Sequence, residues 1–200
     1  MKIFGIDPGS ERTGYGCVET DGSRHRIVTC GAIISSVASF PARLLTIHTR
    51  LSELLSECRP DAVAIENLFF AANVRSALKL GHARGVAMLA AVEAGVPVIE
   101  YTPAEIKRAV VGYGRAEKHQ VQHMVKLILG LPAVPAPHDA ADALAVAICH
   151  VHSQSFGRAR LGAEAANGGR TAKAAGKAAT SWRHYRPASA PSAQRRGKPA

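Results

Sequence analysis

The stretch Lys2-Ile3-Phe4-Gly5-Ile6-Asp7-Pro8-Gly9 decides the fold. Its apolar residues form a short run that predicts a buried strand, and Pro8-Gly9 then turns the chain. The run ends on Asp7, so a carboxylate is expected at the mouth of a core strand. A buried carboxylate without a partner is costly. Asp7 therefore stays ionised only if a positive group lies beside it.

The segments after this strand alternate between strand and helix patterns. Two further strands are expected up to Ile34, with a hairpin turn at Asp21-Gly22. An amphipathic helix follows, from about Pro41 to Cys58. The later expected elements are a strand at 62–65 that ends on Glu66, a strand at 96–99, and helices at 73–94, from 102, at 117–129 and at 139–152. This order predicts an α/β layered domain with the first strand central in a mixed sheet.

Charge is distributed unevenly along the chain. Residues 1–150 hold 15 Lys and Arg against 14 Asp and Glu, whereas residues 151–200 hold 10 Lys and Arg and one acid, Glu164. Past about Ser153 the apolar period disappears, and Ala, Gly, Lys, Arg, Ser and Pro dominate. Such a composition buries too little surface to offset the entropy of ordering. We therefore expect a globular domain at 1–152 and a disordered basic tail at 153–200, which favours polyanions.

The sequence also bears on the cellular compartment. No apolar run approaches the roughly 20 residues that a membrane span needs, and Asp7 and Pro8 fall where a signal peptide would be apolar. The four cysteines are widely spaced and form no C-x-x-C pair, which argues against zinc and thioredoxin-like sites. A cytoplasmic protein with reduced thiols and no membrane contact is expected.

Four carboxylates are candidates for a shared site. Asp7 and Glu66 each end an apolar strand, and adjacent parallel strands would bring them within a few ångströms of each other. Asp139 and Asp142 stand three residues apart at the start of an alanine-rich helix, so they share a face. Four carboxylates in one place resist joint ionisation, and Mg²⁺ or Mn²⁺ removes the conflict. Two such ions about 3.5–4 Å apart would support phosphodiester hydrolysis.

Each acid has a simpler interpretation when taken alone. An acid at a strand end is more often a turn former or a salt-bridge partner, and the Asp139/Asp142 pair also suits the dipole of a helix start. The joint pattern is what favours a metal site. His138 precedes Asp139, but oxygen suits Mg²⁺ better than nitrogen does. We therefore keep Asp139 as the ligand and expect His138 to lie beside the ligands, to face solvent, or to shuttle a proton near neutral pH.

A series of motifs covering nearly all of residues 1–152 resembles the RuvC family of bacterial Holliday junction resolvases. The motifs are Gly5-Ile6-Asp7-Pro8-Gly9, Thr13-Gly14-Tyr15-Gly16, Ile65-Glu66, Ser76-Ala77-Leu78-Lys79-Leu80-Gly81, Ala83-Arg84-Gly85-Val86-Ala87, Val110-Val111-Gly112, Ala116-Glu117-Lys118, Val121-Gln122-His123-Met124-Val125 and Asp139-Ala140-Ala141-Asp142-Ala143-Leu144-Ala145.

This resemblance implies an RNase H-like three-layer α/β fold, with a mixed five-stranded sheet flanked by helices. It implies a homodimer that works with the branch-migration helicase complex, RuvA and RuvB. The implied activity is paired, symmetric, Mg²⁺-dependent nicking of four-way (Holliday) DNA junctions during homologous recombination and DNA repair. The products would carry 5′-phosphate and 3′-hydroxyl ends.

The resemblance also implies roles for individual residues. Two metal ions per subunit are expected, with Mn²⁺ able to substitute for Mg²⁺. Lys107 and Lys118 fall on basic residues near the scissile phosphate, and Phe69 falls on an aromatic that stacks on a base. The family's four acidic metal ligands fall on Asp7, Glu66, Asp139 and Asp142.

Other basic residues are expected on the DNA-binding surface. Arg75, Lys79 and Arg84 would line a surface for the DNA backbone; without the resemblance they would be ordinary helix surface. The helix at 73–94 carries Gly81 and Gly85, which permit close approach of a neighbouring helix. We expect it to form the dimer contact, with internal packing as the alternative.

Three other functions remain possible from the sequence. An actin-like or sugar-kinase-like ATPase domain also opens with an Ile-Asp-x-Gly strand, but it needs a second phosphate loop and an adenosine-binding glycine pair that are not found. A non-catalytic nucleic-acid-binding relative should lack some of the four acids. A resolvase-like family tied to ribosomal RNA processing is shorter and lacks the block at 76–81.

Overall fold

The structure is a computed structural model that describes residues 1–35, 39–67 and 73–166. Its elements in chain order are β1 (Lys2–Asp7), β2 (Arg12–Thr20), β3 (His25–Ile34), α1 (Phe40–Cys58), β4 (Ala62–Glu66), α2 (Val74–Glu93), β5 (Val98–Tyr101), α3 (Pro103–Val111), α4 (Lys118–Ile128) and α5 (His138–Ala166).

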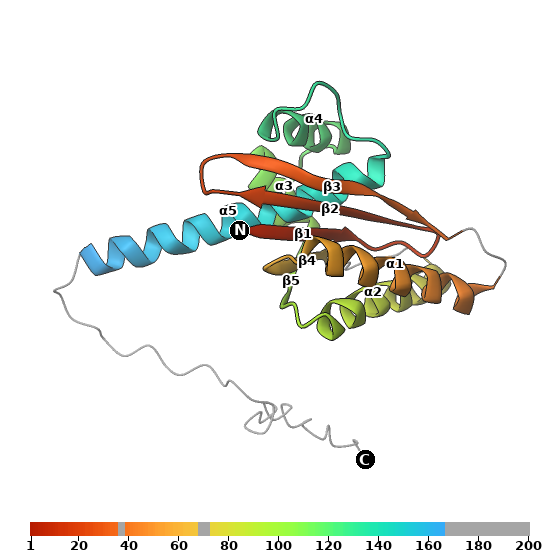
Figure 1. The fold of residues 1–200 in the computed structure, drawn as a ribbon. Helices are drawn as coiled ribbons and strands as arrows, with labels where there is room; N and C mark the ends of the chain where they lie inside the picture. Colours follow the sequence, from red (N-terminus) through yellow and green to blue (C-terminus); the bar gives the residue numbers. More distant parts are fainter. Residues whose placement is uncertain (36–38, 68–72, 167–200) are drawn as a thin grey trace, which may run out of the picture.

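The strands form one mixed sheet in the order β3-β2-β1-β4-β5, with β1 in the centre. Strand β1 pairs antiparallel with β2 and parallel with β4, and β4 pairs parallel with β5. Helices α1 and α2 cover one face of the sheet, and α3, α4 and α5 cover the other (Figure 1). The expected three-layer arrangement with a central first strand is therefore confirmed.

The two faces of the central strands differ in the size of their side chains. On the α1–α2 face, β1 and β4 present large side chains that are fully buried, among them Phe4, Ile6 and Ile65. On the α5 face, the same two strands present Gly5, Ala62 and Ala64 beside Ile3. The alternation of a strand places these two sets on opposite sides. The small set forms a shallow seat for α5, whose buried positions include five alanines, Ala140, Ala141, Ala143, Ala145 and Ala147.

Two glycines permit the closest contacts between α5 and the sheet. A Cβ at Gly5 would lie 2.0 Å from the backbone oxygen of Ala143, and a Cβ at Gly14 would lie 2.0 Å from the backbone oxygen of Asp139. No side chain fits in that space, so glycine is required at both positions. These contacts place the first turns of α5 directly over the site at the ends of β1 and β2.

Local sequence signals explain where the other helices begin. Ser39 caps α1 by accepting a hydrogen bond from the backbone of Ala42, and Asn73 caps α2 through the backbone of Arg75. Thr102 and Glu105 form a reciprocal capping box at the start of α3. The helix starts expected near Pro41, Asn73 and Thr102 are confirmed.

Two expected boundaries are wrong. The last strand is Val98–Tyr101 rather than 96–99, and α5 continues to Ala166 instead of ending at His152. The reason for the longer helix is that Ala, Arg, Leu and Glu are strong helix formers, and adding residues to an existing helix is easier than starting one. The expected tail at 153–200 is therefore helical over its first part. Residues 167–200 lie outside the described residues.

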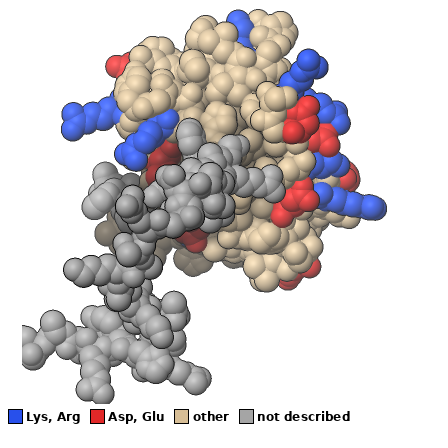
Figure 2. Space-filling view, turned by 90° about the vertical axis from the view of Figure 1, so that its left-hand side faces the viewer, with Lys and Arg blue, Asp and Glu red and all other residues tan. Residues whose placement is uncertain are grey.

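The surface of the globular part carries both signs of charge, as expected from its nearly equal numbers of basic and acidic residues. On the face seen in Figure 2, acidic and basic side chains lie next to one another along one edge.

The four cysteines, Cys17, Cys30, Cys58 and Cys149, are free thiols. Within the described ranges, none of the helices is both long and apolar enough to cross a bilayer.

The glycine contacts can be tested by adding a single methyl group. We expect Gly5→Ala to lower the free energy of unfolding by about 3 kcal/mol or more, because the new Cβ meets the backbone of α5, which cannot move alone. Urea denaturation measures this. Gly31→Ala is the matched control, since its Cβ would meet the tip of the Tyr15 side chain at 2.6 Å, and a side chain can move. Equal losses in the two variants would contradict the proposed backbone contact.

Candidate active site

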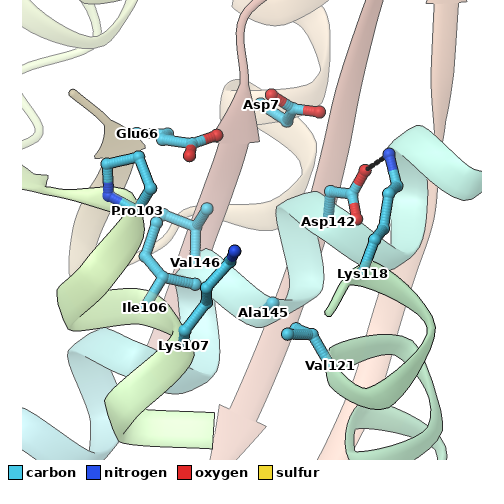
Figure 3. Close-up of a pocket in the computed structure, with 10 residues that line it drawn as sticks. All are labelled: Asp7, Glu66, Pro103, Ile106, Lys107, Lys118, Val121, Asp142, Ala145 and Val146. Atoms are coloured by element: carbon cyan, nitrogen blue, oxygen red, sulfur yellow. Dashed lines mark ion pairs between the residues drawn. The ribbon is translucent and has the colours of Figure 1, made fainter. Parts of the chain in front are cut away.

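The first two acids of the site lie side by side because of strand register. Ile6 of β1 is paired with Ile65 of β4 in parallel, so the next residues, Asp7 and Glu66, leave the same edge of the sheet together. Both side chains line a pocket of about 370 Å³. In Figure 3 the two carboxylates point toward each other at its upper edge. The expected proximity of Asp7 and Glu66 is thus explained by the parallel pairing of β1 with β4.

The third acid comes from helix α5. Asp142 lines the same pocket, opposite Glu66. Its Oδ2 is 2.5 Å from the Nζ of Lys118 at the start of α4. Its Oδ1 accepts a hydrogen bond of 3.4 Å from the Nε2 of Gln122, one turn further along α4. Each oxygen of Asp142 therefore has its own donor from the same helix.

The fourth acid, Asp139, lies beside the pocket rather than in its lining. Its Oδ2 accepts a hydrogen bond of 2.9 Å from the Nε of Arg12, at the start of β2. Both side chains are partly exposed, so this ion pair contributes little to stability. Of the four expected ligands, the structure thus brings Asp7, Glu66 and Asp142 together in the pocket and pairs Asp139 with an arginine.

Burial and like charge make Asp7 hard to ionise. Burial is the main cause that raises the pKa of Asp7, and the negative charges of Glu66, Asp142 and Asp139 raise it further, to about 7. Lys118 acts in the opposite direction. A carboxyl group with a pKa near neutrality in a polar pocket marks a place where a positive charge is needed.

The charged groups that line the pocket beside Asp7 are two further acids and two lysines. The pKa of Glu66 is raised, first by burial and then by Asp142, while Lys118, Lys107 and a hydrogen bond with Asp7 lower it. The pKa of Lys118 is raised, chiefly by its hydrogen bond to Asp142. Lys107 projects from α3 toward the middle of the pocket in Figure 3. Two lysines and three carboxylates therefore face one small volume.

The donor set fits a hard divalent cation. The side chains that meet here offer carboxylate oxygens, which Mg²⁺ and Mn²⁺ prefer. The negative charges of Glu66, Asp142 and Asp139, which add to burial in raising the pKa of Asp7, are charges that a bound cation would offset. In the arrangement described, no three His, Cys, Asp or Glu side chains of residues 1–35, 39–67 and 73–166 are close enough together to form a ready-made metal site. The oxygen donors suit a hard cation, while Lys118 pairs with Asp142 and Arg12 pairs with Asp139.

The remaining expected residues lie in varied places. Arg75 and Lys79 are exposed on α2, and the Nζ of Lys79 lies 5.9 Å from the centre of the Phe40 ring. Arg84 pairs with Glu100 of β5 at 2.6 Å, and its Nε donates to the backbone oxygen of Glu66. His138 is exposed at the start of α5. Phe69 lies outside the described residues.

Sequence reasoning missed two residues that contact the acids. Arg12 stands five residues after Asp7, just past the Pro8-Gly9 turn, so proximity to the first acid was an available signal. Gln122 had no such signal, because nothing local distinguishes an inward-facing glutamine from one on the helix surface.

Comparison with known proteins identifies the family. The family model described as "Crossover junction endodeoxyribonuclease RuvC" matches residues 3–150. The chain belongs to the RuvC family. The RuvC of Trichlorobacter lovleyi is 52% identical over 188 residues, which cover 94% of this chain and 100% of that protein. The RuvC of Ruminiclostridium cellulolyticum is 54% identical over 159 residues, 78% of this chain and 95% of that protein.

A solved RuvC structure agrees with this assignment. Thermus thermophilus RuvC in complex with a Holliday junction substrate matches with a TM-score of 0.75 at 40% sequence identity, covering 78% of this chain and 96% of that chain. The RNase H-like fold expected from the motifs is therefore confirmed. Membership of the RuvC family also decides against the ATPase alternative.

The raised pKa of Asp7 predicts an unusual pH dependence of stability in metal-free protein. The folded-state pKa of about 7 lies above the ordinary value of 3.8, so the folded state holds a proton that the unfolded state releases. The free energy of unfolding should therefore fall as pH rises from about 4 to about 7, by at most about 4 kcal/mol from this group. Asp7→Asn should remove this contribution.

The measurement is urea denaturation with a chelator at several pH values. Wild type and Asp7→Asn should have similar stability near pH 4.5, and the variant should be the more stable above pH 7. A stability difference that is constant across this range would contradict the raised pKa.

Proposed function

We propose that this chain is a structure-selective endonuclease that resolves four-way DNA junctions by paired, symmetric, metal-dependent nicks in homologous recombination and DNA repair. The observation that carries the proposal is the meeting of Asp7, Glu66 and Asp142 at one pocket, in a chain that belongs to the RuvC family. The RuvC of Thermus thermophilus, a member of the same family, has been solved with a Holliday junction substrate.

The acids are proposed to hold Mg²⁺, with two ions per subunit and Mn²⁺ able to substitute. Asp7, Glu66 and Asp142 would be ligands from the pocket, and Asp139 would join them by exchanging its contact with Arg12. Bound divalent ions would supply an activated water and stabilise the leaving 3′ oxygen in phosphodiester hydrolysis. Breaking the bond between phosphorus and the 3′ oxygen leaves 5′-phosphate and 3′-hydroxyl ends.

The two lysines are proposed to hold the scissile phosphate. Lys107 and Lys118 both line the pocket, so both ammonium groups can reach a phosphate placed beside the acids. Lys118 is 63% exposed, and it can exchange its contact with Asp142 for a phosphate oxygen without a large change in burial. This would neutralise charge that develops on the phosphate during cleavage.

The DNA contacts outside the pocket remain proposals from the sequence. Arg75 and Lys79 are exposed and available to the DNA backbone, whereas Arg84 is engaged by Glu100 and would have to exchange that partner. Phe69 is proposed to stack on a base. The further partners, RuvA and RuvB, are proposed from the family resemblance. A cytoplasmic location is proposed from the sequence, which has widely spaced cysteines and no apolar run long enough to span a membrane.

A homodimer is proposed to form through α2. Ala77, Leu78, Gly81, Gly85 and Leu89 line an open apolar groove on this helix, together with His82 and Val86. A Cβ added at Gly81 or Gly85 would meet nothing within 4 Å, so these glycines serve no contact inside the described part of the subunit. A groove of this kind suits a helix from a second copy, and two copies would place two pockets on one symmetric junction.

The dimer proposal predicts the effect of a charge in the groove. Leu78→Glu should dissociate the dimer, because the carboxylate would be buried between two apolar helices. Leu127→Glu is the matched control, since Leu127 of α4 is 56% exposed and Leu78 is 60% exposed. Analytical ultracentrifugation should show a monomer only for Leu78→Glu. Dimers of unchanged stability in both variants would contradict this contact surface.

The catalytic proposal is tested on a synthetic four-way junction. Wild-type protein should nick it symmetrically with Mg²⁺ and leave it intact with a chelator. Asp7→Asn, Glu66→Gln and Asp142→Asn should each lower the nicking rate by about a hundredfold or more, while binding to the junction persists through backbone contacts.

Glu53→Gln is the control, because Glu53 is an exposed acid that pairs with Arg50 on α1. It should nick at the wild-type rate. Normal nicking by Asp7→Asn, or by the wild type without metal, would show that the pocket acids are not the metal ligands.

A further inference from the structure

Gln122 is a polar side chain on the inner, otherwise apolar face of α4. It is 6% exposed, and its buried neighbours along the helix include Val121 and Val125. A buried amide lowers stability unless it is hydrogen-bonded. Its side-chain contact is the bond from Nε2 to Oδ1 of Asp142. The one polar residue that α4 buries is thus directed at a pocket acid.

Lys118 and Gln122 hold Asp142 as a pair. They are four residues apart on α4 and so share a face of the helix. The ammonium of Lys118 contacts Oδ2 and the amide of Gln122 contacts Oδ1. Two donors on a rigid helix, one for each oxygen, restrict the rotation of the carboxylate plane.

We propose that Gln122 is a positioning residue that orients the carboxylate of Asp142 for metal binding. The proposal rests on the metal-dependent function proposed above. Donors behind a ligating side chain commonly fix its orientation, and their loss weakens metal binding. The bond of 3.4 Å is long for a hydrogen bond, which leaves room for it to shorten when the acid takes up its working geometry.

The two donors differ in how easily they leave Asp142. Lys118 is 63% exposed and can move to a phosphate. Gln122 is only 6% exposed, so leaving Asp142 would strand its buried amide without that hydrogen bond, which is costly. Gln122 therefore remains on Asp142 after Lys118 has exchanged partners, and it keeps the carboxylate oriented while the substrate is bound.

A substitution of Gln122 can distinguish a functional role of this residue from a structural one. Met has nearly the shape of Gln and no polar group to bury, so Gln122→Met should pack well and remove a desolvation cost. If the residue served stability alone, Met would be an adequate replacement. A loss of metal affinity without a loss of stability is the result that only a positioning role explains.

The experiment compares wild type, Gln122→Met and Gln122→Leu. Calorimetric titration with Mn²⁺ alone should give about tenfold weaker binding in both variants. The nicking rate should fall at limiting Mn²⁺ and recover at high Mn²⁺, with KM for the junction unchanged. The unfolding temperature should be equal to or above that of wild type. Gln154→Met, the same exchange at an exposed position of α5, should match wild type in every measurement.

Two results would overturn the inference. The first is unchanged Mn²⁺ affinity and unchanged nicking in Gln122→Met and Gln122→Leu. The second is a fall in unfolding temperature that accompanies the loss of activity in both variants, which would show a structural role. Wild-type protein that fails to nick junctions would instead overturn the proposed function.

Discussion

Helix α5 lies so close to strands β1 and β2 that its backbone oxygens at Ala143 and Asp139 occupy the space where side chains of Gly5 and Gly14 would be. The position of the helix is thus set by backbone against backbone, with no flexible side chain between them. Asp139 and Asp142 are carried by the first turns of that helix, and Asp7 ends the strand on which it rests. A shift of α5 by the width of one methyl group would move Asp139 and Asp142 away from Asp7. The spacing of the acids therefore depends on this backbone contact.

The central features of the fold and site could be predicted because they are local patterns. An apolar run that ends in Asp7 and a second that ends in Glu66 specify two core strands with acids at the same edge once the strands pair in parallel. The spacing of Asp139 and Asp142 specifies a shared helix face. The alanines around them match the small residues Gly5, Ala62 and Ala64 on the opposing strands.

Features that depend on partners distant in the sequence could not be predicted. The contact of Arg84 with Glu100 joins α2 to β5. The contact of Arg12 with Asp139 joins residues near opposite ends of the domain's sequence. Nothing in the sequence around Arg84 or Arg12 indicates which acid it pairs with. The extent of α5 was missed for another reason, since the composition beyond Ser153 looks unstructured when it is judged apart from the helix that it continues.

The pairing of acids with cations has a consequence for how nucleic acid reaches the pocket. Asp142 is held by Lys118, Asp139 by Arg12, and Lys107 faces Glu66 from α3. The pKa of Asp7 is raised to about 7, so below that pH its carboxyl group is mostly protonated and neutral. Three of the four carboxylates thus have a cation nearby, so an approaching polyanion meets a weaker repulsive field than four unpaired acids would create. The reaction centre proposed at this pocket can accordingly lie within the surface that the nucleic acid would cover, instead of being set back from it.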